Sequence, residues 1–385
     1  MSWKHLFSRS LSADPERLHM AAHSHHLWPD ASFDGQVECW NDAARLADRK
    51  WDRVMDEVWP EVQRRVAAEL GAGMPDAIVF ALNTHELLVR LFAAASDKWP
   101  IRVLTSDGEF HSARRQFARW EEAGAAVVER IATEPFDRFS DRFLDAARSG
   151  AHDFIFVSQV LFGSGRIFDW VADLAGMAGP EGPWVVIDGY HAFMAIETPF
   201  APEASRSAFY LGGGYKYAMA GEGCAFLHAP LGFGPRPRIT GWYSEFEDLT
   251  LPPGQVGYRQ DAMRFMGATF DPSGLYRFNA VQRMLDENAL TTAKISARVA
   301  GLQSRLLNGL SSTVFYSAEL LNPLMPGDHA RFLAFRTPQA QRWCRELASR
   351  NCIVDVRGDV LRIGLGLYHD ESDVDRFAAL AGDLG

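Results

Sequence analysis

Hydrophobic and polar residues follow one another along this chain in two alternating patterns. Short, almost continuous apolar runs are typical of strands buried on both faces, and they lie at residues 77–81, 101–105, 153–158, 184–188, 207–211 and 223–228. Segments with apolar residues three and four positions apart predict helices between these runs, for example at 84–95 and 112–123. Buried strands that alternate with helices predict an α/β fold with a largely parallel sheet.

The two ends of the chain show other patterns. Residues 36–70 are helical and amphipathic, and Pro60 predicts a break into two helices because proline lacks a backbone N–H. A long helical pattern returns at 275–310. A small α+β unit follows, with strands at 313–317, 331–337, 352–355 and 360–363 and helices at 339–349 and 372–383. We therefore predict an N-terminal segment (1–35), a large domain (36–275) and a small C-terminal domain (276–385).

Composition narrows the class of protein. The chain has 385 residues, of which 47% are hydrophobic and 23% charged, as in ordinary soluble globular proteins with room for two cores. A net charge of −10 argues against binding to nucleic acids and to anionic membranes. We find no apolar run of membrane-spanning length, no N-terminal secretion signal and no disulfide or metal spacing among the four cysteines. We therefore expect a cytoplasmic protein.

An aspartate and a lysine stand at the ends of two predicted strands. Asp188 ends the run at 184–188, and Lys216 follows the run at 207–211 after a turn of three glycines. Ligands of parallel sheets bind beyond the carboxyl ends of the strands. A carboxylate that keeps a pyridine nitrogen protonated and an amine that forms a Schiff base are what pyridoxal phosphate (PLP) requires. The alternatives are an aspartate that caps a turn or helix and a solvated loop lysine.

Four residues near two other strand ends could complete such a site. Asn83 and Thr84 open a helix whose free N–H groups could bind a phosphate, although the same residues could serve only as a cap. Phe110 follows the strand at 101–105 and could stack on a cofactor ring, as could His111. The alternative for Phe110 and His111 is a loop with one buried aromatic residue.

Three further sets of polar residues have alternative interpretations. His191, three residues after Asp188, could contact a ring oxygen or orient the aspartate, or be structural. Arg362 lies inside an apolar strand and requires an anion, which could be a substrate carboxylate or an internal salt bridge. Histidines at 23, 25 and 26 lack a carboxylate at ligand spacing, so we predict no metal site.

Together these residues resemble the class V branch of the fold type I PLP-dependent enzymes, and within it kynureninase. The matching motifs are Asp188-Gly189-Tyr190-His191, Tyr215-Lys216-Tyr217 with its later glycines, Ile239-Thr240-Gly241-Trp242, and the run Arg362-Ile363-Gly364-Leu365-Gly366-Leu367-Tyr368. The resemblance implies a fold type I transferase fold, in which a mostly parallel seven-stranded sheet forms the large domain and a small α+β domain follows. It also implies PLP as the cofactor and a homodimer with shared active sites.

The resemblance assigns roles to individual residues. It implies Lys216, Asp188 and His191 as catalytic residues and implies further cofactor contacts from Asn83, Thr84, Phe110, Tyr215, Trp242 and Thr269. Thr269 could reach the phosphate of the partner subunit. Arg362 would hold the substrate carboxylate, and the segment 23–29, with His25 and His26, would line the substrate pocket. This segment departs from the Gly-Asn-Ser-Leu-Gly-Leu pattern of kynureninases, which leaves the substrate open.

The implied reaction is hydrolytic cleavage of a Cβ–Cγ bond in an amino acid, with Lys216 removing the Cα proton and alanine released. The alternatives are a class V aminotransferase, an enzyme like a cysteine desulfurase or lyase, and a catalytically idle PLP-fold protein that serves as a binding module. Cysteine desulfurases carry a reactive cysteine on a loop before the arginine strand. Residues 351–359 are too short for that loop.

Overall fold

The computed structural model of the protein describes residues 2–245, 251–324 and 330–385. Within these ranges, seven strands form one sheet in the order β2-β8-β7-β6-β5-β3-β4. Their bounds are β2 (Ile78–Ala81), β3 (Ile101–Ser106), β4 (Ala126–Ile131), β5 (Phe154–Ser158), β6 (Trp184–Asp188), β7 (Phe209–Gly213) and β8 (Ala225–His228). Only β8 runs antiparallel to its neighbours, so the prediction of a mostly parallel seven-stranded sheet is confirmed.

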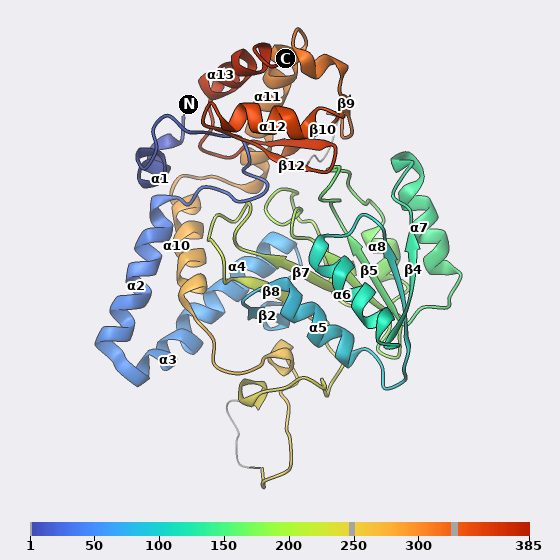
Figure 1. Ribbon diagram of the computed structural model, residues 1–385. Helices are drawn as coiled ribbons and strands as arrows, with labels where there is room; N and C mark the ends of the chain where they lie inside the picture. The colour runs from blue at the N-terminus through green and yellow to red at the C-terminus, as the bar shows by residue number, and fades with distance from the viewer. Residues whose placement is uncertain (1, 246–250, 325–329) are drawn as a thin grey trace.

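Helices surround this sheet and continue into both ends of the chain (Figure 1). They are α1 (Ser8–Ser12), α2 (Asp30–Leu46), α3 (Lys50–Arg53), α4 (Trp59–Leu70), α5 (Thr84–Ala94), α6 (His111–Glu122), α7 (Phe139–Arg148), α8 (Val171–Ala175), α9 (Pro202–Ser205), α10 (Ser273–Glu287), α11 (Thr292–Leu310), α12 (Ala340–Ala348) and α13 (Glu371–Gly382). Every residue of β5, β7 and β8 is buried, which explains why these strands are apolar on both faces.

A second, antiparallel sheet lies in the C-terminal part of the chain, at the top of Figure 1. Its order is β12-β13-β10-β9, formed by β9 (Glu319–Leu320), β10 (Phe332–Arg336), β12 (Asp355–Arg357) and β13 (Val360–Gly364). The short β1 (Leu18–His19) pairs with β11 (Cys352–Ile353), so the N-terminal segment packs against this part. The division at residues 35 and 275 stays a prediction, since α2 and α10 run across both positions.

Three local predictions were wrong or incomplete. The interruption after α2 lies at Ala47, whose φ is 51°, while Pro60 occupies the first turn of α4, where a missing N–H is tolerated. Residues 314–317 form a short 3-10 helix and not a strand, because the Thr313 side chain caps it by accepting from the Phe315 N–H. The edge strand β4 was not predicted, since most of its residues are not buried and it lacks a continuous apolar run.

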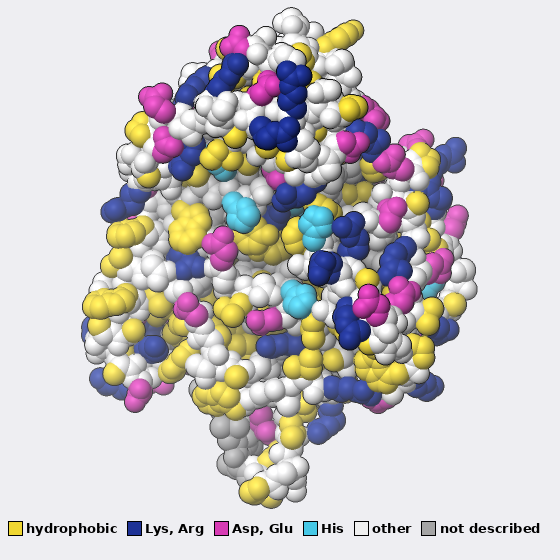
Figure 2. All heavy atoms as spheres, in the orientation of Figure 1, with side chains coloured by type: hydrophobic (Ala, Val, Ile, Leu, Met, Phe, Trp, Pro, Cys, Tyr) yellow, Lys and Arg dark blue, Asp and Glu magenta, His cyan; other side chains and the backbone are white. Residues whose placement is uncertain are grey.

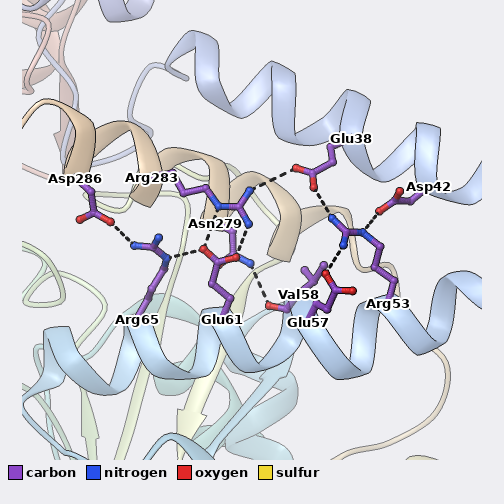
Figure 3. A network of polar contacts seen from close by, with 10 residues as sticks. All are labelled: Glu38, Asp42, Arg53, Glu57, Val58, Glu61, Arg65, Asn279, Arg283 and Asp286. Carbon is purple, nitrogen blue, oxygen red and sulfur yellow. Dashed lines mark hydrogen bonds and ion pairs between the residues drawn. The ribbon is translucent and has the colours of Figure 1, made fainter.

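A polar network joins the helices α2, α4 and α10 (Figure 3). Arg283 of α10 pairs with Glu61 of α4 and lies 3.7 Å from a carboxylate oxygen of Glu38 in α2. Asn279, one turn earlier on α10, donates a 3.1 Å hydrogen bond to the Val58 carbonyl at the end of a π-helical turn. The network therefore fixes the N-terminal helices against the helix that leads into the C-terminal part.

Candidate active site

The carboxyl ends of β5 and β6, together with the turn after β7, meet at one cavity. Its lining includes residues predicted from the sequence, namely Thr84, Phe110, Asp188, His191, Tyr215 and Lys216. It also includes residues that were not predicted, namely Ser158, Val160, Phe162 and Tyr190. In Figure 2, histidine and basic side chains gather along the boundary between the C-terminal part and the sheet part.

Lys216 lies at the centre of this cavity with a buried side chain. Its Nζ donates to the His23 carbonyl at 3.2 Å and lies 2.8 Å from His191 Nε2. Burial lowers the pKa of Lys216 to about 7, and the charge of Arg362 contributes. A large fraction of this amine is therefore neutral at neutral pH, as a nucleophilic or proton-accepting lysine requires.

His191 is the immediate neighbour of the lysine amine. Burial lowers its pKa well below 6.5, so the ring is neutral and Nε2 accepts the hydrogen bond from Lys216 Nζ. The ring proton then lies on Nδ1, which is buried and has no hydrogen-bond partner among the described residues. A donor left unpaired in this way indicates that the cavity suits a ligand with an acceptor at that point.

Asp188 ends β6, beside Ser158 of β5 in the strand register. Its Oδ1 accepts a 3.0 Å hydrogen bond from the Tyr190 N–H. Burial raises the pKa of Asp188, while the Tyr190 hydrogen bond and the charge of Lys216 oppose that rise. A buried carboxylate is stabilised by a cation against it, so a protonated pyridine nitrogen is a suitable ligand for this position.

Two helix N-termini bring Phe110 and Thr84 to the cavity. Phe110 precedes α6, and its ring packs edge-on against the ring of Phe162 with centroids 5.4 Å apart. Thr84 is the first residue of α5, and Asn83 caps that helix by accepting from the Glu86 N–H at 3.0 Å. Thr84 thus lines the cavity, whereas Asn83 performs the capping role and does not line it.

Aromatic rings connect Tyr215 with the N-terminal segment. The Tyr215 ring is stacked on His25 with centroids 5.3 Å apart and lies 4.7 Å from the ring of Tyr190. His25 is exposed and reaches the cavity only through Tyr215. His26 is buried elsewhere, edge-on to Tyr368 at 5.0 Å, and burial lowers its pKa to about 3. In this structure His26 therefore belongs to the packing between the N-terminal segment and the C-terminal part.

Arg362 is buried on β13 and has an internal partner. Its Nη2 donates to the Asp355 carboxylate and its Nη1 to the Phe162 carbonyl. Its Nε is buried and has no hydrogen-bond partner among the described residues. Of the two anions considered for this arginine, the internal salt bridge is thus the one formed here.

Trp242 and Thr269 lie outside the cavity. Trp242 begins the 3-10 helix Trp242–Glu245 and is 44% exposed, and Thr269 is also exposed. Their segments lie together, since the Tyr243 N–H donates to the Gly267 carbonyl at 3.2 Å. The cofactor contacts expected of Trp242 and Thr269 therefore stay predictions.

Glu109 and His23 are two buried neighbours of the site to which the sequence assigned no individual role. The Glu109 carboxylate accepts 2.5 Å hydrogen bonds from the hydroxyls of Ser106 and Ser158, and burial raises its pKa to about 7. His23 is fully buried, and its ring is stacked on Phe332 at 4.7 Å. The histidine cluster was a signal for His23, but the sequence could not show which member points inward.

The described parts of the chain contain no group of three or more His, Cys, Asp or Glu residues placed to hold a metal ion. None of the helices in residues 2–245, 251–324 and 330–385 is long and apolar enough to cross a membrane.

Solved structures with the same fold extend over the whole chain. A cysteine desulfurase from Thermococcus onnurineus NA1 is 18% identical, with a TM-score of 0.79, and the match covers 100% of this chain and 99% of that one. A mutant of C-DES with glycine covalently linked to its PLP cofactor is 13% identical, with a TM-score of 0.81 and full coverage of both chains. The cysteine desulfurase CsdA from Escherichia coli is 15% identical, with a TM-score of 0.76 and coverage of 95% and 94%. This chain therefore has the fold of the fold type I PLP-dependent enzymes.

Sequence comparison reaches the C-terminal part alone. Residues 295–380 match the family described as the kynureninase C-terminal domain. No curated protein matches the chain significantly. The matched region contains β13 and Arg362 but not the strand ends that carry Asp188 and Lys216.

Proposed function

We propose that the protein is a PLP-dependent enzyme that acts on an amino acid through Lys216. The observation that carries this proposal is a buried amine, with a pKa of about 7, in one cavity with Asp188, His191 and Phe110. When bound, PLP supplies an aldehyde that a lysine can engage and a ring that accepts electrons from Cα. The fold is that of enzymes that use this cofactor.

The residues of the cavity fit the cofactor group by group. Asp188 would hold the pyridine nitrogen, and Phe110 would cover a ring face. Thr84 and the N-terminus of α5 would hold the phosphate. The unpaired Nδ1–H of His191 would find an acceptor in the ring oxygen, which would remove the cost of a buried unpaired donor, about 1–3 kcal/mol.

The chain's own groups would then move the proton. Lys216 Nζ, kept partly neutral by burial, accepts the proton from the substrate Cα. His191 Nε2 holds this amine by a hydrogen bond and does not compete for the proton, since its own pKa is far lower. Arg362 would bind the substrate carboxylate.

We propose kynureninase-like hydrolysis of a Cβ–Cγ bond, with release of alanine, as the reaction. The kynureninase match over residues 295–380, which include Arg362, supports this choice. A lyase-like reaction on a sulfur-containing amino acid is the second candidate. It is favoured by the structural likeness to the cystine C-S lyase C-DES in complex with its reaction product, cysteine persulfide. A desulfurase that uses a cysteine thiol fits less well. None of the four cysteines lines the cavity, and burial raises the pKa of Cys352 to about 12.

We also propose a homodimer with shared active sites. Phe33, Val37 and Trp40 are exposed on one face of α2, which is a suitable surface for a second copy. The exposed positions of Trp242 and Thr269 support contacts across such an interface.

The first test is the visible-edge absorbance of the purified protein after incubation with PLP. We expect a band that is absent in Lys216→Ala and unchanged in Lys98→Ala, a lysine outside the cavity. A normal band in Lys216→Ala would contradict the proposed role of the lysine. Assays for alanine release from kynurenine and 3-hydroxykynurenine, with cysteine, alanine and aspartate in parallel, would then separate hydrolysis, lyase chemistry and transamination.

A further inference from the structure

The guanidinium group of Arg362 is hydrogen-bonded to a carboxylate of the same chain, that of Asp355. The register of β12 and β13 places Asp355 directly opposite Arg362, and Arg362 Nη2 donates to Asp355 Oδ2. The other oxygen, Oδ1, lies 3.0 Å from Nη1 of Arg357, whose side chain is 40% exposed. Asp355 therefore has one buried cationic partner and one that reaches solvent.

The pairing of Asp355 with Arg362 is incomplete. The Nε and Nη2 groups of an arginine share one edge, and a carboxylate recognised in the bidentate mode accepts from both. Asp355 accepts a hydrogen bond only from Nη2 of Arg362. The Nε of Arg362 is buried and has no hydrogen-bond partner among the described residues. Because the cross-strand register fixes the Asp355 backbone, a free carboxylate can satisfy this edge better than Asp355 does.

This inference rests on the proposed function. We propose that Asp355 is a competing internal anion, which occupies the carboxylate subsite at Arg362 and yields it to the carboxylate of the substrate. The exchange leaves the Asp355 charge paired with Arg357, so no carboxylate remains unpaired. His23, whose Nε2 lies 3.7 Å from Asp355 Oδ2, borders the same position. A compound with an amino group but no carboxylate has nothing to exchange and gains nothing from Arg362.

The test compares a carboxylate ligand with a matched ligand that lacks the charge. The PLP-loaded protein and its Asp355→Asn variant are titrated with L-alanine and L-alaninamide, and binding is followed by the change in visible absorbance. We expect L-alanine to bind about tenfold more tightly to Asp355→Asn, as expected when one competing charge-assisted hydrogen bond is lost. The affinity for L-alaninamide should not change. Asp375→Asn, which removes the exposed pair of Asp375 with Arg305, serves as the control.

A second variant keeps the proposal testable if Asp355→Asn fails to fold. Arg357→Gln removes the partner that receives the displaced Asp355, and we expect it to weaken L-alanine binding while leaving L-alaninamide unaffected. Equal L-alanine affinity in the unmodified protein and Asp355→Asn would overturn the role of Asp355, and so would weaker binding in Asp355→Asn. Failure of the unmodified protein to bind PLP would instead overturn the proposed function, and with it this inference.

Discussion

Lys216, Asp188 and Glu109 are three buried ionisable groups in or beside one cavity. The sequence indicated the first two, because each follows an apolar strand and strand ends in parallel sheets meet at one edge. It could not indicate Glu109, whose carboxylate accepts a hydrogen bond from Ser158, a residue 49 positions later on another strand. Ionisable residues whose partners lie on distant strands are therefore the part of the site that sequence patterns do not show.

Glu109 makes the stability of the cofactor-free protein depend on pH. Its pKa is raised by burial from 4.5 to about 7, and the charge of Asp188 adds to the rise. The folded chain thus binds this proton more tightly than the unfolded chain. The stabilisation is complete below about pH 4.5 and is lost as the pH rises through 7. At about 1.36 kcal/mol per pKa unit, the loss amounts to about 3 kcal/mol.

The measurement is the difference in unfolding free energy between the unmodified protein and Glu109→Gln, taken by urea unfolding from pH 4.5 to 8. We expect the advantage of the unmodified protein to shrink across this range, because glutamine does not titrate. Glu122→Gln, at the exposed end of the helix α6 that follows Glu109, should show no such trend. A difference for Glu109→Gln that is constant with pH would show that this carboxyl does not titrate there.

Helices and strands with buried apolar faces were predicted well, and those defined by local polar contacts were not. The strands β5 and β6 and the helix α5 lie within one residue of their predicted bounds, because burial on both faces, or on one helical stripe, leaves a strong pattern. The capped turn at residues 314–317 and the edge strand β4 escaped prediction. One depends on a single side-chain hydrogen bond, and the other has few buried residues.

The contact between α10 and the π-helical turn gives a prediction for the elements. We expect Asn279→Ala to lower the unfolding free energy by about 1–3 kcal/mol, because it removes a buried hydrogen bond to the Val58 carbonyl and leaves a cavity in place of the side chain. Arg283→Ala, one turn away on the same helix, should cost less than about 1 kcal/mol, since its ion pairs are partly exposed. Urea unfolding of both variants measures whether Asn279→Ala loses more unfolding free energy than Arg283→Ala. A larger loss in Arg283→Ala would mean that the ion pairs dominate this contact.

At the scale of the whole molecule, the exposed apolar face of α2 bears on the proposed dimer. Trp40 is 70% exposed, and tryptophans in interface centres often contribute 2 kcal/mol or more. We expect Trp40→Lys to weaken self-association at least about thirtyfold, as measured by sedimentation. Tyr316→Lys, at an exposed aromatic residue of the C-terminal part, should leave association unchanged. Equal association of the unmodified protein and Trp40→Lys would exclude this face as the interface.

The pairing of β1 with β11 joins the beginning of the chain to residues near its end. The amide of Leu18 donates to the Asn351 carbonyl, and a few residues beyond β1 the His23 carbonyl accepts from Lys216. On the ribosome, the N-terminal segment therefore has no strand partner until residues 352 and 353 have emerged. The contact of the His23 carbonyl with Lys216 is therefore coupled to the pairing of β1 with β11, and we expect this part of the cavity to close only after that pairing has formed.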